Sequence, residues 1–551
     1  MAIQRLNDTP GTSGYWLKRL GGVLDKRNAG IVFYTDGSER RPASDLSMAV
    51  YDQYYRGVQP LPFSSDKYRA AFGDRLRGSN ENICGVVVDS LVERLEVRGF
   101  RMPPEEGTPD SSPNTPGDGE AWRIWQANGL DAAMRQGFRS CAVKGEINLL
   151  VGPGPDEQTP AITVEDPLET VVLVSRGRRV VALKRWFDVE RERWRAFVYF
   201  PDRIEKFVST QTHDWFTSAP EAMLGQVLSW EAQEDRSDDP QLLRHELGVV
   251  PMIPLVNKPN LAGMGESDLA AIIPIQDEIN KLVADMIIAS EFGAFRQKWA
   301  IGIDVPRNPS TGEPIPNWQA SIAQMWAIGV KDDFDAQRDP EPKVGQFDVT
   351  PLSPYLEAIK QRLQMAATIT RMPPHYLLGD PGQWPSGESL TAAESGLVAK
   401  ANDRTLDHSD PIEEAMRLGF RVIGDLERAS ATGMETIWRD PRFRSESEHV
   451  DATVKKQALD IPNEILWEEH YSPQQIERIR AAQRRQQASL GARDPLMAEA
   501  EMEILARRFE LLGVARRAGA TFESAARLVG LEDIESSGLE PVTVSEQGDY
   551  A

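Results

Sequence analysis

The strongest constraint on the fold of this chain comes from residues 248–299. A short apolar run, VVPMIPLV, is followed by a glycine-rich turn and then by a helical pattern from Ser267 to Phe292. Apolar residues recur there at spacings of three and four, which predicts a helix with one apolar stripe. The stretch contains no catalytic motif, so it favours a structural element over an enzyme site. The stripe contains Leu269, Ile272, Ile273, Ile279, Leu282, Val283, Met286 and Ile287.

The start and the polar faces of this helix can also be predicted. Ser267 is the expected N-cap, because a serine hydroxyl can accept a hydrogen bond from the first turn. Pro274 lies beyond that turn, so we expect a kink at residues 270–271. Residues 266–292 carry six acidic side chains and one lysine outside the stripe. A solvated acidic face is therefore expected.

Composition limits the class of protein. The 551 residues exceed one typical domain, so several domains or an elongated protomer are expected. The net charge of −22 is unsuitable for a simple DNA-binding domain, which neutralises phosphates with Lys and Arg. It is compatible with a surface past which DNA slides, or with solubility alone. We find no signal peptide and no run of about 18 apolar residues that would span a bilayer.

Histidine and cysteine give no sign of a metal or cofactor. Cys84 and Cys141 are the two cysteines, and two unpaired, partly buried thiols in a reducing compartment are expected. Two cysteines and six scattered histidines cannot form a metal cluster of the Cys/His type. We therefore predict no metal site and no cofactor.

The chain divides into an N-terminal α+β part and a helical remainder. Helices are expected at residues 43–55, 80–97 and 122–138, and five strands follow, from EINLLVGPG to RWRAFVYFP. These strands predict a mostly antiparallel sheet. Further helices are expected at residues 354–370 and 386–429, with the strand-like pieces KWAIGIDV and QMWAIGV before the first of them.

Motifs that resemble enzyme signatures have simpler explanations. GPGP at residues 152–155 lacks the GK[ST] of a phosphate-binding loop and predicts a hairpin turn. SGES at residues 386–389 begins a helix and is not a nucleophile elbow, so Ser386 is the expected helix cap. Asp277 and Asp285 could hold magnesium in a DNA-processing enzyme of a mobile element, but a solvated helix face is favoured.

Several motifs in a fixed order resemble the portal proteins of tailed bacteriophages. They are DQYYRG, VDSLVERLEVRGF, VPMIPLVNKPNLAGMGESDLAAIIPIQDEINKLVADM, and ITRMPPHYLLGDPGQWPSGESL with the long helix after it. The resemblance covers residues 51–487. The chain resembles in particular the portals of long-tailed siphophages of actinobacteria. Each motif alone is weak, whereas their order and spacing together are fairly specific.

The resemblance implies an α+β portal protomer with wing, stem, clip and crown regions. The composition of residues 102–120, with five prolines and three glycines, predicts a solvated loop. The resemblance implies no role for this loop or for the acidic tail at 531–551. By position, the regions are an N-terminal wing at 1–266, a first stem helix at 267–294, a clip at 295–350, a second stem helix at 351–371, a tunnel-loop region at 372–385, a long wing helix and following wing segment at 386–460, a helical crown at 461–530 and a flexible acidic tail at 531–551.

The resemblance also implies roles for individual residues. Gln383 and Trp384 are candidates for the loop that projects into the central tunnel. The stripe residues of the first stem helix would pack between neighbouring subunits, and its acids would face the tunnel. The interface candidates are Leu269, Ile272, Ile279, Leu282 and Met286, and the acidic candidates are Asp277, Glu278 and Asp285.

A structural, non-enzymatic role is therefore expected for this chain. The implied partners are further copies in a ring of twelve, the major capsid protein and scaffold, the large terminase subunit, head-completion or adaptor proteins, and double-stranded DNA that is bound weakly. The implied location is the capsid portal vertex of the virion, and the host cytoplasm during assembly. A head-to-tail adaptor without a DNA path is the second alternative to a portal, beside the metal-dependent enzyme.

Overall fold

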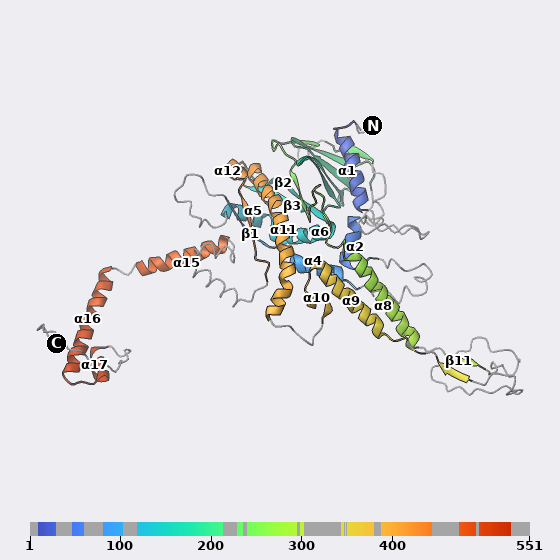
Figure 1. Ribbon diagram of the computed structural model, residues 1–551. Helices are drawn as coiled ribbons and strands as arrows, with labels where there is room; N and C mark the ends of the chain where they lie inside the picture. Colours follow the sequence, from blue (N-terminus) through green and yellow to red (C-terminus); the bar gives the residue numbers. More distant parts are fainter. Residues whose placement is uncertain are drawn as a thin grey trace. The chain divides into compact units, whose positions relative to one another are not determined.

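A computed structural model shows two compact units, residues 1–473 and 474–551, which are described separately (Figure 1). The described residues are 9–28, 47–59, 81–102, 118–212, 229–234, 240–294, 298–301, 343–346, 348, 350–379, 387–442, 473–491 and 495–530. Gln383, Trp384, Ser386, the QMWAIGV segment and the acidic tail at 531–551 lie outside these residues, as do most of the 102–120 loop and of the predicted clip.

The predicted α+β class and antiparallel strands are confirmed. Instead of one sheet, the first unit has a three-stranded sheet in the order β10-β2-β3 and a larger one in the order β4-β5-β6-β7-β8, with β9 beside β7. The strands form two sheets because one edge of β2 pairs with β3 and the other edge pairs with β10, about a hundred residues later in the chain. The strands are β2 (Glu146–Asp156), β3 (Thr159–Glu165), β4 (Thr170–Ser175), β5 (Arg178–Asp188), β6 (Arg193–Tyr199), β7 (Arg203–Ser209), β8 (Trp230–Ala232), β9 (Leu242–Arg244) and β10 (Met252–Val256).

One face of the larger sheet is covered by α1 (Ser13–Asn28), as Figure 1 shows. Leu17, Leu20 and Leu24 recur at helical spacing and are buried against apolar side chains of β4, β5, β6 and β7. Arg185 of β5 donates a hydrogen bond from Nη2 to Asp25 Oδ1 at 2.7 Å, which fixes the helix across the strands. The N-terminal helix is therefore part of the first unit's core.

The largest core lies between the small sheet and a group of helices. α11 (Gly387–Val422) and the start of α8 (Ile273–Ala294) contribute to this core. Other helices that contribute to it are α2 (Met48–Arg56), α4 (Ile83–Val92), α5 (Gly119–Ala127), α6 (Leu130–Lys144) and the end of α9 (Ser353–Thr370).

The single helix predicted at residues 122–138 is wrong, because the chain forms α5 and α6 with a break between them. Gly129 has a φ of +60°, a left-handed conformation that glycine adopts without steric cost. The Asn128 side chain donates to the Ile124 and Pro160 carbonyls and accepts from the Ile162 amide. These hydrogen bonds to β3 interrupt the single helix that the apolar periodicity predicted.

Other helix boundaries also differ from prediction. The helix predicted at residues 80–97 is the shorter α4, and Val97 begins β1 (Val97–Arg101). α8 begins at Ile273, six residues after Ser267, so Ser267 is not its N-cap and Pro274 causes no internal kink. A proline in the first turn leaves no intrahelical bond unmade, whereas deeper in a helix its ring would clash with an earlier carbonyl. α11 ends at Val422 and not near Ala429, since Gly424 adopts a φ of +82° and Asp425 caps the short α12 (Leu426–Ala429).

The remaining elements of the first unit are short except for one helix. α9 (Ser353–Thr370) confirms the helix predicted from Pro354, and α10 (His375–Leu378) follows it. β1 (Val97–Arg101) pairs with β13 (Glu435–Trp438). β11 (Lys298–Ile301), within the predicted strand KWAIGIDV, pairs with β12 (Lys343–Gln346).

The second unit consists of helices in the part that the structure describes. They are α15 (Pro473–Gly491), α16 (Pro495–Arg517) and α17 (Phe522–Val529). Two of them begin at prolines, as expected for a residue that cannot donate a backbone hydrogen bond. α16 and α17 pack together through Leu512, Ala525 and Ala526. Across both units, no described helix is long and apolar enough to span a membrane.

The GPGP segment lies within β2, and the turn of the β2–β3 hairpin follows at residues 157–158, so the turn predicted at residues 152–155 is misplaced by a few positions. Gly154 is the most constrained glycine of the segment. A Cβ atom at this position would lie 1.9 Å from the Thr159 carbonyl oxygen. We predict that Gly154→Ala lowers the free energy of unfolding by about 1–3 kcal/mol, because the backbone of one strand must move. Thermal or urea unfolding of the purified protein measures this change.

The matched control is Gly22→Ala in α1, where an added Cβ meets nothing within 4 Å. That variant should be neutral or more stable by about 0.5–1 kcal/mol, since alanine favours a helix over glycine. Equal stability of Gly154→Ala and wild type would contradict the packing of the hairpin.

Candidate functional site

The predicted stem helices form a pair, α8 and α9, that leaves the core of the first unit (Figure 1). Ile273, Ile275 and Ile279 are buried at the start of α8, and Ala366 and Ala367 are buried near the end of α9. The two buried ends belong to the same core, so α8 leads away from it and α9 returns. The pair is thus fixed at one end, which we call its root.

The five interface candidates fall into two groups. Leu269, Ile272 and Ile279 are buried in the main core of the protomer itself. Leu282 and Met286, one turn apart on α8, are partly exposed. The predicted contact between subunits therefore stays a prediction, and Leu282 and Met286 are the candidates with surface left to offer a neighbour.

The three acidic candidates each have a partner within the protomer. Asp277 Oδ1 accepts a hydrogen bond from the Tyr54 hydroxyl at 2.9 Å. Glu278 Oε2 lies 3.0 Å from Arg362 Nε on α9, and Asp285 Oδ2 lies 2.6 Å from Lys281 Nζ on the same helix. The charge pair between Glu278 and Arg362 joins α8 to α9. The face of α8 that carries these three acids is therefore less negative than the number of its acidic side chains suggests.

Asp268 is the acidic residue whose role the sequence did not reveal. It was expected as an exposed acid in the first helical turn, but its side chain is fully buried at the root of α8, in the segment before the helix begins. Its Oδ1 lies 2.8 Å from Lys258 Nζ, 3.0 Å from Lys400 Nζ and 3.4 Å from Arg404 Nη2. Asn257 donates from Nδ2 to Oδ2 at 3.1 Å. These five residues are called the Asp268 cluster below.

The electrostatics of the Asp268 cluster follow from burial and charge. Burial alone would raise the pKa of Asp268, but Lys400, Lys258 and Arg404 outweigh it and hold that pKa well below its usual range. Burial lowers the pKa of Lys400, while the carboxylate opposes this effect. The cluster is thus a charged network that depends on the single carboxylate at its centre.

The cluster joins segments that are far apart in sequence. Lys400 and Arg404 lie one turn apart on α11, whereas Lys258 and Asn257 follow β10. The backbone N–H of Asp268 also donates to the Ala142 carbonyl on α6 at 2.8 Å. No local pattern connects these segments. The sequence signal for a buried charge cluster was the spacing of Lys400 and Arg404, two cations one turn apart on an apolar helix face.

A buried histidine lies on the same side of α11. His408 stacks on Phe138 with ring centroids 5.3 Å apart, and its Nε2 is 4.0 Å from Cys141 Sγ. Burial, together with the positive charge of Arg404, lowers the pKa of His408 to about 3. Cys84 and Cys141 are both free and buried, which confirms the predicted unpaired thiols. This packing serves the core and presents no reactive group to solvent.

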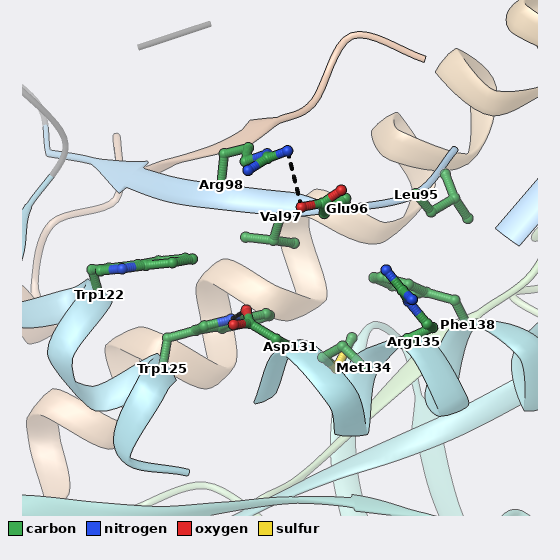
Figure 2. Close-up of a pocket in the computed structure, with 10 residues that line it drawn as sticks. All are labelled: Leu95, Glu96, Val97, Arg98, Trp122, Trp125, Asp131, Met134, Arg135 and Phe138. Atoms are coloured by element: carbon green, nitrogen blue, oxygen red, sulfur yellow. Dashed lines mark hydrogen bonds and ion pairs between the residues drawn. The ribbon is translucent and has the colours of Figure 1, made fainter. Parts of the chain in front are cut away.

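A separate hollow of about 160 Å³ lies between β1 and the α5–α6 pair. Figure 2 shows Trp122 and Trp125 stacked along one side of it, with ring centroids 6.5 Å apart. Within its lining, Arg98 pairs with Glu96 at 3.1 Å, and Trp125 Nε1 donates to Asp131 Oδ1 at 2.7 Å. The hollow contains no arrangement of a nucleophile and a base. Within the described ranges, no three His, Cys, Asp or Glu side chains gather to hold a metal ion.

We predict that Asp268→Asn lowers the free energy of unfolding by about 3–5 kcal/mol at pH 7. The substitution leaves the buried Lys400 and Arg404, with the partly exposed Lys258, around a neutral amide, and breaking a buried ion pair from one side has a cost of that size. Urea or thermal unfolding of the purified protein provides the measurement. The control is Asp285→Asn, in an exposed pair, for which about 0.3–0.5 kcal/mol is expected.

The dependence on pH has a definite direction. An unfolded Asp has a pKa of about 3.9, and the pKa of the folded Asp268 is lower. The carboxylate therefore contributes its full stabilisation above about pH 4, and this is lost as the pH falls toward the folded pKa. A loss no larger than that of Asp285→Asn at pH 7 would contradict this role of the cluster.

Comparisons with known proteins identify the family. The family model described as "Phage portal protein, SPP1 Gp6-like" matches residues 80–489. The portal protein of Mycobacterium phage D29 is 29% identical over 385 residues, which cover 67% of this chain and 70% of that protein. The portal protein of Mycobacterium phage L5 is 29% identical over 389 residues, with the same coverage. The resemblance predicted from the motifs is confirmed, and the chain belongs to the phage portal protein family.

Proposed function

We propose that this protein forms the ring at one capsid vertex through which DNA enters during packaging and leaves during ejection. Portal proteins are structural components of the virion and assemble there with other phage proteins. The observation that supports this function in the protomer is the α8–α9 pair, which is fixed at its root and has apolar side chains left uncovered. Two helices that pack only on each other bury little apolar surface. Their other apolar sides therefore need a further partner.

The uncovered side chains lie on both helices. Leu282 and Met286 are partly exposed on α8, and Met365 and Ile369, also one turn apart, are exposed on α9. In a ring each subunit contacts the next through two different surfaces, so one side of the pair can cover the other side of its neighbour's pair. We assign the subunit contact of the stem to these residues, while Leu269, Ile272 and Ile279 maintain the protomer core beneath it.

The charge of the protein suits a channel through which DNA slides. The net charge is −22, and the acidic candidates on α8 are Asp277, Glu278 and Asp285. Phosphates that meet few fixed cations are held weakly, so DNA can move. We propose that the parts of these acids left exposed face the tunnel, and that no catalytic step and no cofactor are involved.

The remaining regions are assigned by position along the chain. We propose that residues 1–266 and 386–460 form the wing, 267–294 and 351–371 the stem, 295–350 the clip and 461–530 the crown. The clip would bind the large terminase subunit during packaging and head-completion proteins afterwards, while the wing would contact the capsid protein and scaffold. Assembly would take place in the host cytoplasm. For residues 102–120 and 531–551 we assign no role.

We predict that electron micrographs of the purified protein show rings of about twelve subunits with a central hole. Neither a metal-dependent enzyme nor an adaptor without a DNA path requires such particles. Leu282→Asp and Met286→Asp should lower the fraction of protein in rings, because each would bury a charge between subunits. Asp285→Asn on the same helix is the control and should assemble normally.

The same rings provide a second measurement. They should bind linear duplex DNA weakly, and tight binding that weakens steeply with salt would argue against a sliding surface. Monomers or dimers with metal-dependent nuclease activity would instead support the enzyme of a mobile element.

A separate prediction concerns Gln383 and Trp384, which we propose lie near the tunnel wall. Deletion of these two residues should impair DNA packaging or retention in assembling phage, because the loop that contains them would contact the passing DNA. Particle yield and packaged DNA content measure the effect. Normal packaging and normal DNA retention would show that the placement is wrong.

A further inference from the structure

The turn between β10 and α8 exposes two apolar side chains. Leu261 has a relative exposure of 111%, and Met264 has 63%. Both lie in residues 258–265, which we call the 258–265 turn. Single exposed apolar residues are ordinary. Two on one short turn form a small apolar surface.

The 258–265 turn is held closed by its own hydrogen bonds. The Asn260 amide donates to the Met264 carbonyl at 3.0 Å, and the Gly263 amide donates to the Asn260 carbonyl at 2.8 Å. The Asn260 side chain accepts from the amides of Ala262 at 2.9 Å and Met264 at 3.0 Å. The two apolar side chains are therefore presented by a backbone that is already ordered.

The base of the turn is anchored in the core. A Cβ atom on Gly265 would lie 2.0 Å from the Gly145 carbonyl oxygen, so the two backbones are in direct contact. Lys258, at the other end, has a φ of +48°, an uncommon conformation for a residue other than glycine, and its Nζ reaches Asp268. Such a conformation is kept only where the surroundings determine it. The Asp268 cluster thus fixes the turn as well as the root of α8.

We propose that the 258–265 turn is a contact between neighbouring subunits, with a second copy of this chain covering Leu261 and Met264. The inference rests on the ring proposed above. A rigid segment loses little conformational entropy on binding, which makes its apolar side chains effective anchors.

The absence of charge on this turn permits a second copy as the occupant. Each copy carries a net charge of −22, so copies repel one another and associate best where the local surface is uncharged and apolar. Residues 259–265, PNLAGMG, contain no charged side chain. The turn is also continuous with the stem: between it and α8, Ser267, Asp268, Leu269 and Ile272 are buried, so both move as one body with the protomer. A neighbour that covers the stem can cover the turn in the same contact.

Cysteine labelling tests the contact directly in the full-length protein. Leu261→Cys introduces an exposed thiol, whereas the native Cys84 and Cys141 are buried, and burial raises the pKa of the Cys84 thiol to about 12. Rings and unassembled protein are separated by size and treated with a water-soluble maleimide. We expect the introduced thiol to react at least about tenfold more slowly in rings than in unassembled protein.

The outcomes separate this inference from the proposed function. Equally fast labelling in rings and in unassembled protein would overturn the proposed contact but not the proposed ring. It would mean that solvent or a different protein contacts the turn. Failure of the wild-type protein to form rings under any assembly condition would overturn the proposed function and the contact together.

A double variant tests whether the side chains contribute to assembly. Leu261→Ser with Met264→Ser should shift the assembly midpoint to at least about tenfold higher protein concentration, because two anchors are lost from each contact. The matched control is Leu426→Ser on α12, where the leucine is 69% exposed. Thermal unfolding of the unassembled protein should be unchanged in both. Assembly of the double variant like wild type, or an equal loss in the control, would contradict the proposal.

Discussion

The fold of the first unit depends on one buried carboxylate. Asp268 lies where four segments meet: the end of α6, the turn after β10, the root of α8 and the middle of α11. Taking a carboxylate and two of its three cations out of water has a large cost, which close pairing of the charges offsets. The arrangement therefore tolerates little displacement of any of the four segments, so it specifies their relative positions more sharply than apolar packing would.

This fixed joint explains how the rest of the unit is organised. The α8–α9 pair is anchored in the core at its root, where the contact of Glu278 with Arg362 also joins the two helices. Its apolar residues divide accordingly: those at the root complete the core, and those farther out remain available to other molecules. The 258–265 turn starts from the same joint, so the two candidate surfaces for subunit contact keep a constant relation to each other. A ring of identical subunits requires such constancy, because a small change in one contact angle is repeated at every interface.

Local patterns predicted much of the secondary structure. Alternation and turn residues located β2 to β6. Errors arose where a tertiary contact outweighed a local preference. Asn128 bonds to β3 and interrupts what periodicity predicted as one helix, and the segment after Ser267 is held by the Asp268 cluster in a non-helical form until Ile273. Apolar spacing cannot report such contacts, because the competing partner lies elsewhere in the chain.

The sequence by itself determined the α+β class, most strands and helices, and the resemblance to phage portals, since each of these follows from local periodicity or from the order of motifs. The tertiary structure alone decided which members of the apolar stripe are covered within the protomer. It also showed that Asp268 is a buried partner of Lys258, Lys400 and Arg404, whereas its position predicted a solvated acid. The physical reason is that Lys400 and Arg404, which complete this burial and charge pairing, lie more than a hundred positions from Asp268 in the chain. One helical pattern is equally consistent with a core, with a subunit contact or, as in α8, with both at different points along its length.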